Sequence, residues 1–501
     1  MMRPSRLLLF FCALATALSA MTPDEVFEDI KANASPDELY RFSFALPKGG
    51  DIHHHFGGSV PMEYVIDYYT DKERNGGQDF YVRTKIELCE GDMVPGIPGS
   101  SGTIYHRSKD VPSGGCVRPR VLFHCMRDVD WAALKPCCQS QFKKVSDLSE
   151  REKEAWLSGL KLDEAGEGRD EFFEKTWWRL GPCFNDITIG PELLVENMKA
   201  FGREGVRYME IQTIPFTATN SKGELVGEEV WYETYKKRLQ QPDALATGVT
   251  VRFQVVVIRF LPNAEDAVRR AFAFVDSHRD LFVGINMAGR EDNTKGQAAR
   301  FIDVYREMHR KYPKVHLAIH AGESDEPNTN IRDTLLLGAD RIGHGFNILD
   351  DPDTYLLMRG HQTLIEVNLV SNKLLEYTKD YSDHHFPVSL RTGIPVCLNT
   401  DDRGMWDSNM TDEHFVAIQE FNLSWEELIS LAEMSLEHAF VEPVEKQRML
   451  AEYKAEIETF AKTYLTADWK TKIAQIEPDV SRYGHITFGL SLPVTQGQPL
   501  P

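Results

Sequence analysis

Eight short apolar segments, separated by helical patterns, constrain the fold of this chain more than any other feature. Most are rich in β-branched residues and almost continuously apolar, as parallel strands covered on both faces are. Amphipathic helical patterns lie between them, for example at 263–278 and 297–312. We predict strands at 50–55, 207–212, 251–258, 281–287, 314–320, 340–345, 363–369 and 394–400. Eight alternating units favour the α/β class and a closed (β/α)8 barrel.

The remaining segments divide the chain around that barrel. We assign the barrel to residues 46–69 and 171–470, preceded by an N-terminal helical arm at 21–45 that breaks near "NASPDE". Residues 70–170 differ in composition: they hold "GDMVPGIPGSSG", most of the cysteines and a charged helical run. We therefore predict a cysteine-rich insertion after the first strand, and an irregular C-terminal tail at 471–501.

The first 20 residues have the pattern of a secretory signal. Arg3 and Arg6 precede an apolar run from Leu7 to Leu18, and small residues follow. The run is too short for a transmembrane helix. We expect cleavage near Ala17–Ala20, an extracellular location and no membrane association after cleavage.

Cysteine usage supports export. One stretch contains six cysteines: Cys89, Cys116, Cys125, Cys137, Cys138 and Cys183. In a secreted protein such a cluster predicts disulfides, although six cysteines allow fifteen pairings and spacing does not choose among them. Cys397 stands alone in an apolar run, where we expect it to be buried.

Charge excludes one class of partner. The formal net charge is −20, and 42% of the 501 residues are hydrophobic. An acidic surface repels phosphate backbones, so we predict no nucleic-acid partner. We expect a small-molecule substrate, and a homodimer remains open.

Residues with reactive side chains lie at the C-terminal ends of four of the predicted strands. The carboxyl ends of all barrel strands meet on one face, where active sites are built, so side chains distant in sequence converge there. The residues concerned are His53, His55, His320, His344, Asp401 and Asp402.

The histidine run itself indicates a metal site. Alternate side chains of a strand point the same way, so His53 and His55 share one direction and His54 takes the other. Two imidazoles with a further histidine and a carboxylate suit Zn²⁺, and the absence of nearby thiolates favours a catalytic over a structural site.

Five motifs in the chain resemble those of the adenosine deaminase family. They are "PKGGDIHHHFGGSV", "HAGES", "DRIGHGF", "SNKLLE" and "GIPVCLNTDD". The apparent signal, the "LPKG" before the histidines and the cysteine-bearing insertion look like the secreted, growth-factor-related branch of that family. The resemblance implies one Zn²⁺ per chain, with the ligands His53, His55, His320 and Asp401.

The resemblance also implies roles for four other residues. Glu323 would protonate the purine ring nitrogen beside the attacked carbon, and His344 would orient and deprotonate the zinc-bound water. Asp402, holding a proton, would bond the imidazole-side ring nitrogen, and the backbone N–H of Gly289 would bond a further ring nitrogen.

Departures from the family pattern concern the sugar end of the substrate. Gly57 stands where the family often has an acidic residue, and Gln212 where it often has arginine. Arg403 and Asn368 replace a proline and a cysteine. The first departure predicts a raised KM for adenosine, which Gly57→Asp would lower. Trp177, in a "WW" pair, is either a lid over the base or part of the core.

The function expected from these observations is secreted, zinc-dependent deamination of adenosine and 2′-deoxyadenosine. The chain lacks the H-x-E and P-C-x-x-C motifs of cytidine-type deaminases. Two alternatives stay open: a related barrel amidohydrolase that deaminates another purine or amine-bearing heterocycle, and a secreted binding or signalling protein on the same scaffold.

Overall fold

The computed structural model of the chain describes residues 21–87, 89, 121–291 and 296–497. The predicted signal at 1–20 and Cys116 lie outside the described residues.

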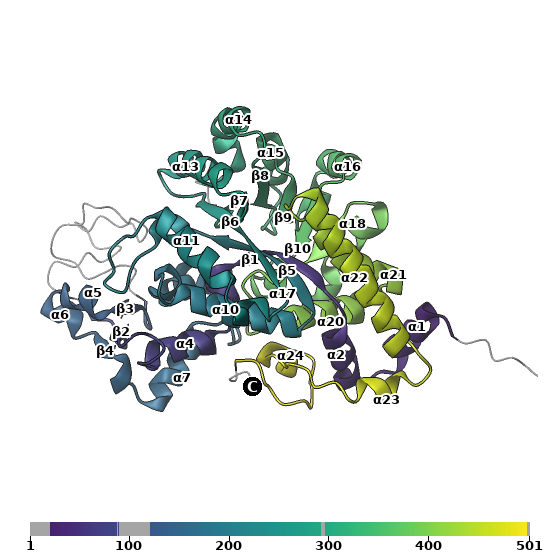
Figure 1. Cartoon of the computed structure of the whole chain (residues 1–501), viewed down its shortest axis with the longest axis horizontal. Helices are drawn as coiled ribbons and strands as arrows, with labels where there is room; N and C mark the ends of the chain where they lie inside the picture. Colours follow the sequence, from purple (N-terminus) through teal and green to yellow (C-terminus); the bar gives the residue numbers. More distant parts are fainter. Residues whose placement is uncertain (1–20, 88, 90–120, 292–295, 498–501) are drawn as a thin grey trace, which may run out of the picture.

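Eight parallel strands form the barrel (Figure 1), as the apolar segments predicted. Their order in the sheet follows the sequence, so each new strand is added beside the previous one. The strands are β1 (Gly49–His55), β5 (Val206–Thr213), β6 (Thr250–Ile258), β7 (Phe282–Ala288), β8 (His316–Ala321), β9 (Arg341–His344), β10 (Leu364–Val367) and β11 (Val396–Leu398).

Helices surround this sheet and follow its strands. The longer ones are α10 (Gly190–Arg203), α11 (Glu228–Leu239), α13 (Ala264–Ser277), α14 (Ile302–Lys311), α15 (Asn330–Leu337), α16 (Pro352–His361), α18 (Phe386–Thr392), α20 (Met410–Phe421), α21 (Trp425–Glu437) and α22 (Pro443–Tyr464). Short helices at the strand ends include α3 (Phe56–Ser59), α17 (Leu369–Leu374) and α19 (Arg403–Trp406).

A narrow seam closes the barrel between its first and last strands. The backbone N–H of His55 donates to the carbonyl of Asp401 at 3.1 Å, and the N–H of Asp401 donates to the carbonyl of His53 at 3.1 Å. His54 and Asp401 form a single parallel bridge there. The ends of the barrel sheet therefore meet at residues that the sequence predicts to be metal ligands or their neighbours.

The N-terminal arm consists of two helices, α1 (Pro23–Asn33) and α2 (Pro36–Ala45), which break at the expected place. Thr22 and Ser35 each form a capping box that satisfies free N–H groups at a helix start. The apolar faces of both helices pack on the C-terminal helices: Phe27 meets Trp425 with ring centroids 5.6 Å apart, and Phe42 meets Phe460 at 5.3 Å.

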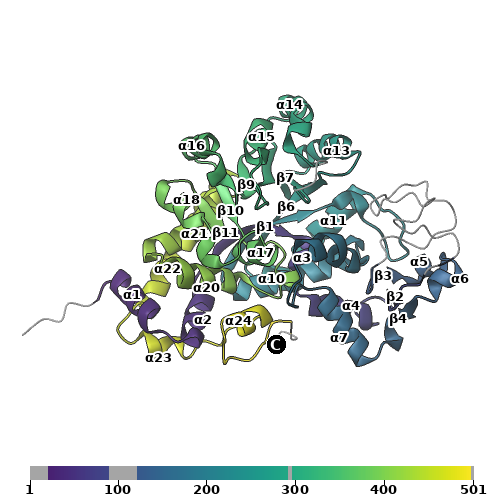
Figure 2. The same cartoon turned by 180° about the vertical axis from the view of Figure 1, so that it is seen from behind.

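The segment after α3 begins with α4 (Met62–Thr70). It then builds a three-stranded antiparallel sheet, β3-β2-β4, from Phe80–Arg83 (β2), Cys125–Arg127 (β3) and Phe142–Lys144 (β4). Helices α5 (Asp128–Ala132), α6 (Pro136–Gln139) and α7 (Glu150–Gly159) accompany it. Figures 1 and 2 show this sheet and the N-terminal arm on opposite sides of the barrel.

A disulfide joins two of the clustered cysteines in this insertion, Cys89 and Cys137. Cys138 is also disulfide-bonded, whereas Cys125 and Cys183 are buried thiols. The sheet is not cored separately, because Val82, Cys125 and Trp156 belong to the same apolar cluster as barrel residues.

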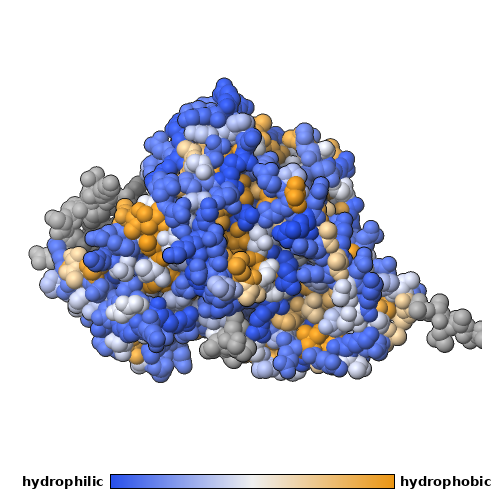
Figure 3. All heavy atoms as spheres, in the orientation of Figure 1, coloured by the Kyte–Doolittle hydropathy of each residue, from blue (hydrophilic) through white to orange (hydrophobic). Residues whose placement is uncertain are grey.

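The face of the molecule drawn in Figure 3 is mainly hydrophilic, with smaller hydrophobic patches. The C-terminal segment adds two short helices, α23 (Trp469–Ile473) and α24 (Arg482–Thr487). Among the described residues, no helix has both the length and the apolar character needed to cross a bilayer.

Candidate active site

Three imidazoles and a carboxylate converge where the barrel closes. The Oδ1 atom of Asp401 lies 3.6 Å from Nε2 of His53 and 3.5 Å from Nε2 of His55. The Nε2 atoms of His55 and His320 are 3.2 Å apart. The structure thus brings together the predicted ligands from β1, β8 and the end of β11.

The donor atoms of this cluster fit a metal ion. Nε2 of His53 and Oδ1 of Asp401 are buried and have no hydrogen-bond partner. Burial lowers the pKa of His55 to about 3 and that of His320 well below its usual value, so both rings are neutral, the form that binds metals. Nitrogen and oxygen donors of this kind suit Zn²⁺.

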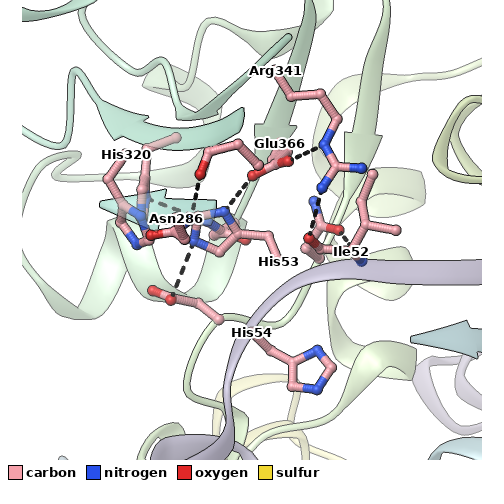
Figure 4. Close-up of polar contacts among 12 residues, drawn as sticks. Ile52, His53, His54, Asn286, His320, Arg341 and Glu366 are labelled. Carbon is pink, nitrogen blue, oxygen red and sulfur yellow. Dashed lines mark hydrogen bonds and ion pairs between the residues drawn. The ribbon is translucent and has the colours of Figure 1, made fainter. Parts of the chain in front are cut away.

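A buried ion network holds His53 in place (Figure 4). Its Nδ1 atom lies 2.6 Å from Glu366, whose other oxygen accepts from Arg341 at 2.6 Å. Arg341 also pairs with Glu210 at 2.6 Å. A carboxylate on Nδ1 orients the ring and turns Nε2 toward the cluster. The sequence analysis did not identify Glu366, Arg341 or Glu210. Their charged side chains within otherwise apolar strands were the signal that could have revealed them.

His54 points away from the cluster, as predicted from strand alternation (Figure 4). Its Nδ1 atom lies 3.1 Å from Asp51, and its ring packs against Phe201 with centroids 5.2 Å apart. His54 is therefore part of the packing between β1 and α10.

Two site residues adopt left-handed backbone conformations at the strand ends. His344 has φ 62° and Asp401 has φ 53°. Non-glycine residues rarely adopt this region, and such residues are concentrated at functional sites. The turn after each strand therefore directs a reactive side chain into the barrel mouth.

Glu323 is buried on the loop that follows β8. Burial, then the charge of Asp401 nearby, raises the pKa of Glu323 well above its usual range, which favours the protonated acid. Glu291 fixes this loop by accepting from the N–H of Gly322 at 3.0 Å and from Asn330 at 2.8 Å. Sequence reasoning missed Glu291, which lies two residues beyond Gly289.

Asp402 occupies a space left open by Gly58. A Cβ atom at Gly58 would lie 1.7 Å from Oδ1 of Asp402, so only glycine fits there. Burial, then the charges of Asp401 and Glu323, raises the pKa of Asp402 well above its usual range. Its Oδ1 atom has no partner. Asp402 can therefore present a protonated carboxyl to a ligand.

The other two residues that the sequence singled out for the substrate also lie at strand ends. Gly289 follows β7 with φ 113°, a conformation that favours glycine. Gln212 pairs with His55 in the β1–β5 register. Both polar atoms of the buried Gln212 side chain lack a partner, so it has hydrogen bonds to offer to a ligand.

A helical segment at 169–179 covers the site near His55. It comprises α8 (Arg169–Glu171), the π-helical turn η2 (Phe172–Thr176) and α9 (Trp177–Arg179). The half-buried Trp177 ring meets His55 at right angles, with centroids 5.8 Å apart. A Cβ atom at Gly57 would lie 3.1 Å from Trp177 and 3.3 Å from Leu180. Side chains of this protein thus fill the space where an acid at position 57 would stand.

Known families provide an independent comparison for this geometry. A family model described as "Adenosine deaminase" matches residues 188–456, more than half of the chain. The chain belongs to the adenosine deaminase family. Adenosine deaminase of Plasmodium falciparum is 25% identical over 340 residues, which cover 67% of this chain and 89% of that protein. N6-methyl-AMP deaminase of Bos taurus is 26% identical over 249 residues, which cover 48% and 69%.

Solved structures share the adenosine deaminase fold at low sequence identity. An adenine deaminase from Arthrobacter aurescens superposes with a TM-score of 0.56 at 18% identity, covering 82% of this chain and 99% of that one. Arabidopsis ADAL complexed with GMP gives 0.57 at 17% identity, covering 82% and 98%. An amidohydrolase from Burkholderia ambifaria with bound Zn gives 0.51 at 16% identity, covering 84% and 94%.

Proposed function

We propose that the protein is a zinc-dependent deaminase that hydrolyses adenosine and 2′-deoxyadenosine, releasing ammonia. The observation that carries the proposal is the position of two buried carboxyl groups with raised pKa values, Glu323 and Asp402, beside the cluster of His53, His55, His320 and Asp401. A purine ring attacked at an amidine carbon needs both a proton donor and a nucleophile.

The residues divide this chemistry among them. The four residues of that cluster would hold zinc, which would supply a nucleophile at neutral pH by lowering the pKa of a bound water to about 7. Glu323 carries the proton that the ring nitrogen takes up during attack. Asp402 and the N–H of Gly289 position the base, and Gln212 offers its unpaired amide to the substrate.

A nucleoside suits the rim of the site better than a nucleotide. A hollow of about 700 Å³ is lined by residues of the helical segment near Arg169 and by Arg290, Asp325, Glu326 and Glu376. Arg290 and Asp325 lie one and two residues beyond Gly289 and Glu323 in the chain. Its arginines are paired: Arg169 with Asp325 at 2.7 Å, and Arg290 with Asp170 at 2.6 Å. A substrate phosphate would have to displace these carboxylates and would meet further acids, Glu326 and Glu376.

A substrate panel tests the proposal. Absorbance loss and ammonia release should be measured with adenosine, 2′-deoxyadenosine, adenine, AMP and N6-methyl-AMP. We expect kcat/KM to be highest for the two nucleosides. A preference for either nucleotide would contradict the nucleoside assignment and favour the activity named for the Bos taurus relative. Lack of turnover with all five would leave the binding-protein alternative.

The metal is tested separately from the substrate. The purified protein should contain about one zinc per chain, and His320→Ala should lower both zinc content and activity because it removes one converging nitrogen. His54→Gln is a matched control, since His54 lies outside the cluster. Full zinc occupancy in His320→Ala would contradict the ligand assignment.

Export is part of the same proposal. The basic and apolar pattern of residues 1–20 supports a cleaved signal, and the Cys89–Cys137 disulfide suits an oxidising compartment. Expression of the full chain in a secreting host should deliver the protein to the medium with a new N-terminus near Ala20.

A further inference from the structure

Behind His344, away from the metal cluster, lies a buried chain of polar side chains. The side-chain oxygen of Asn372 is 3.1 Å from Nδ1 of His344, and its nitrogen is 2.9 Å from Nε2 of His384. The far ring nitrogen of His384, Nδ1, lies 3.2 Å from the backbone nitrogen of Phe386. Asn372 is fully buried, and His384 is nearly so.

The backbone N–H of Phe386 fixes the protons of this chain. A peptide N–H can only donate, so Nδ1 of His384 accepts and carries no proton. Burial, together with the nearby His385 and His344, lowers the pKa of His384 to about 3, so the ring is neutral. Its single proton is therefore on Nε2, directed at Asn372.

Asn372 transmits this constraint to His344. Two N–H groups cannot bond each other, so the amide must turn its oxygen to His384 and its nitrogen to His344; the two amide orientations have the same shape. The NH₂ group then donates to Nδ1 of His344. The side-chain nitrogen of Asn368 lies 3.3 Å from the same Nδ1 atom and can add a second donor.

The geometry points to His384 and Asn372 as positioning residues that hold His344 with its proton on Nε2. That nitrogen is buried and has no hydrogen-bond partner. His344 itself is grouped with His53, His320 and Asp401, close enough for all four to offer atoms to one metal ion. His344 then presents an N–H donor to the site. An unprotonated Nε2 would instead offer a lone pair, which could bind a metal ion or accept a proton. This inference rests on the proposed deamination. It keeps the expected role of His344 in orienting the attacking oxygen, by donating a hydrogen bond to it, and differs from the sequence expectation in assigning it no deprotonation.

The first test reads the tautomer directly. Zinc-loaded protein with ¹⁵N-labelled histidines should show, by NMR, one ring with a protonated Nε2 and a bare Nδ1 whose signals disappear in His344→Gln. A protonated Nδ1 on His344 would overturn the inference. Because this readout needs no turnover, its result is independent of whether adenosine is the substrate.

The second test reverses the tautomer by substitution. The carboxylate of Asn372→Asp accepts from both histidines, which moves the proton of His344 to Nδ1. We expect kcat with adenosine to fall about ten- to hundredfold, the range for a lost hydrogen bond to a charged group, with KM nearly unchanged. Zinc affinity, measured by chelator competition, should rise because a bare Nε2 can bind the ion. Wild-type kcat in this variant would overturn the inference.

A second pair of variants guards against misfolding. His384→Phe keeps an aromatic ring among Phe346, Phe386 and Phe421 but frees Asn372 to take either orientation. It should lower kcat severalfold, and its NMR spectrum should show both His344 tautomers. His385→Gln, at the neighbouring position, is the control and should retain kcat and the wild-type spectrum. A single unchanged tautomer in His384→Phe would exclude the proposed role of His384.

Discussion

Glu323 and Asp402 are buried carboxyl groups near enough that the charge of Glu323 contributes to the raised pKa of Asp402. Among the described residues, neither forms an ion pair with a basic side chain that would keep it ionised: the nearby Arg259 pairs with Glu291 at 3.5 Å. A carboxyl group that stays protonated at neutral pH can donate a proton to a substrate ring. At the scale of single residues, this property separates both acids from Asp401.

Glu323→Gln tests that property. The amide keeps the size and a donor N–H but has no proton to transfer, so kcat should fall by about 10²–10⁴-fold, while zinc content and the thermal unfolding midpoint stay near wild type. Activity should be measured alongside metal analysis. A loss below about tenfold would show that Glu323 is not the acid.

Gly57→Asp shows how the structure changes an expectation drawn from sequence. The sequence suggests that a restored acid would lower the KM for adenosine. A side chain at this position would instead press on Trp177 and Leu180, and overpacking typically costs about 1–3 kcal/mol. We therefore expect a lower unfolding midpoint and no gain in KM.

Two variants separate size from charge in that experiment. Gly57→Ala should be destabilised nearly as much as Gly57→Asp, and adding Trp177→Ala should relieve part of the loss in both. A lower KM and a wild-type unfolding midpoint in Gly57→Asp would support the sequence expectation over the packing argument.

The residues that the sequence identified share one property. Each is a polar residue at the end of an apolar strand, where strand formation itself does not require a polar side chain. His53, His320 and Asp401 could be recognised in this way. The charges of Glu366 and Arg341 inside apolar strands are visible in the sequence, but their role is not, because their partners come from other strands and only the closed barrel brings them into contact. The tautomer of His344 likewise depends on Phe386, whose N–H direction no sequence pattern reveals.

At the scale of elements, α20 is tied to the N-terminal arm and to the C-terminal segment by one buried carboxylate. Asp412 accepts from Tyr40 of α2 at 3.0 Å, from Ser481 at 2.6 Å and from the N–H of Asn409 at 2.9 Å. Burial nevertheless raises the pKa of Asp412 to about 7. The contact between these elements therefore depends on pH.

The sign of that dependence follows from the direction of the shift. A folded pKa near 7, above the unfolded value of about 3.9, means that the folded state binds the extra proton. The stabilisation from Asp412 is complete below about pH 4 and is lost as pH rises through 7. Wild type should lose on the order of 2–4 kcal/mol relative to Asp412→Asn between pH 5 and 8.5.

Urea unfolding of both proteins at several pH values checks this prediction. Asp24→Asn, which changes an exposed acid in α1, is the control and should parallel wild type. Parallel curves for wild type and Asp412→Asn would contradict the role of Asp412.

The barrel strands could be predicted from the sequence, whereas the strands of the small sheet could not. The eight barrel strands could be predicted because each is buried on both faces and therefore apolar. The sheet β3-β2-β4 could not, because its strands are three or four residues long. In addition, β3 is far from its partner β2 in the sequence. Short strands leave too little periodicity to read.

At the scale of the whole molecule, the insertion shares the apolar core of the barrel, and a disulfide links two distant parts of its chain. The Cys89–Cys137 bond spans 48 residues. Closing a loop of this size removes roughly 4 kcal/mol of freedom from the unfolded chain in the loop-entropy model. The bond lies away from the residues proposed for catalysis.

Cys89→Ser should therefore lower the unfolding midpoint by several degrees while leaving kcat at 25 °C within about twofold of wild type. Dithiothreitol should lower the midpoint of wild type, and should lower that of the variant by less, because the variant keeps, among the disulfides of the described residues, only that of Cys138. Peptide mass mapping should find Cys89 linked to Cys137, with Cys125 and Cys183 as thiols. Equal midpoints with and without reductant would contradict a stabilising disulfide.

The seam between β1 and β11 means that the proposed metal site needs the last strand of the barrel sheet as well as the first. His53 and His55 leave the exit tunnel early, whereas Asp401 follows only after all the intervening strands. A nascent chain that ends before Asp401 has neither the closing backbone bonds nor the carboxylate. A metal ion that needs all four ligands therefore cannot bind before β11 has closed on β1, although α20, α21 and α22 still follow in the chain.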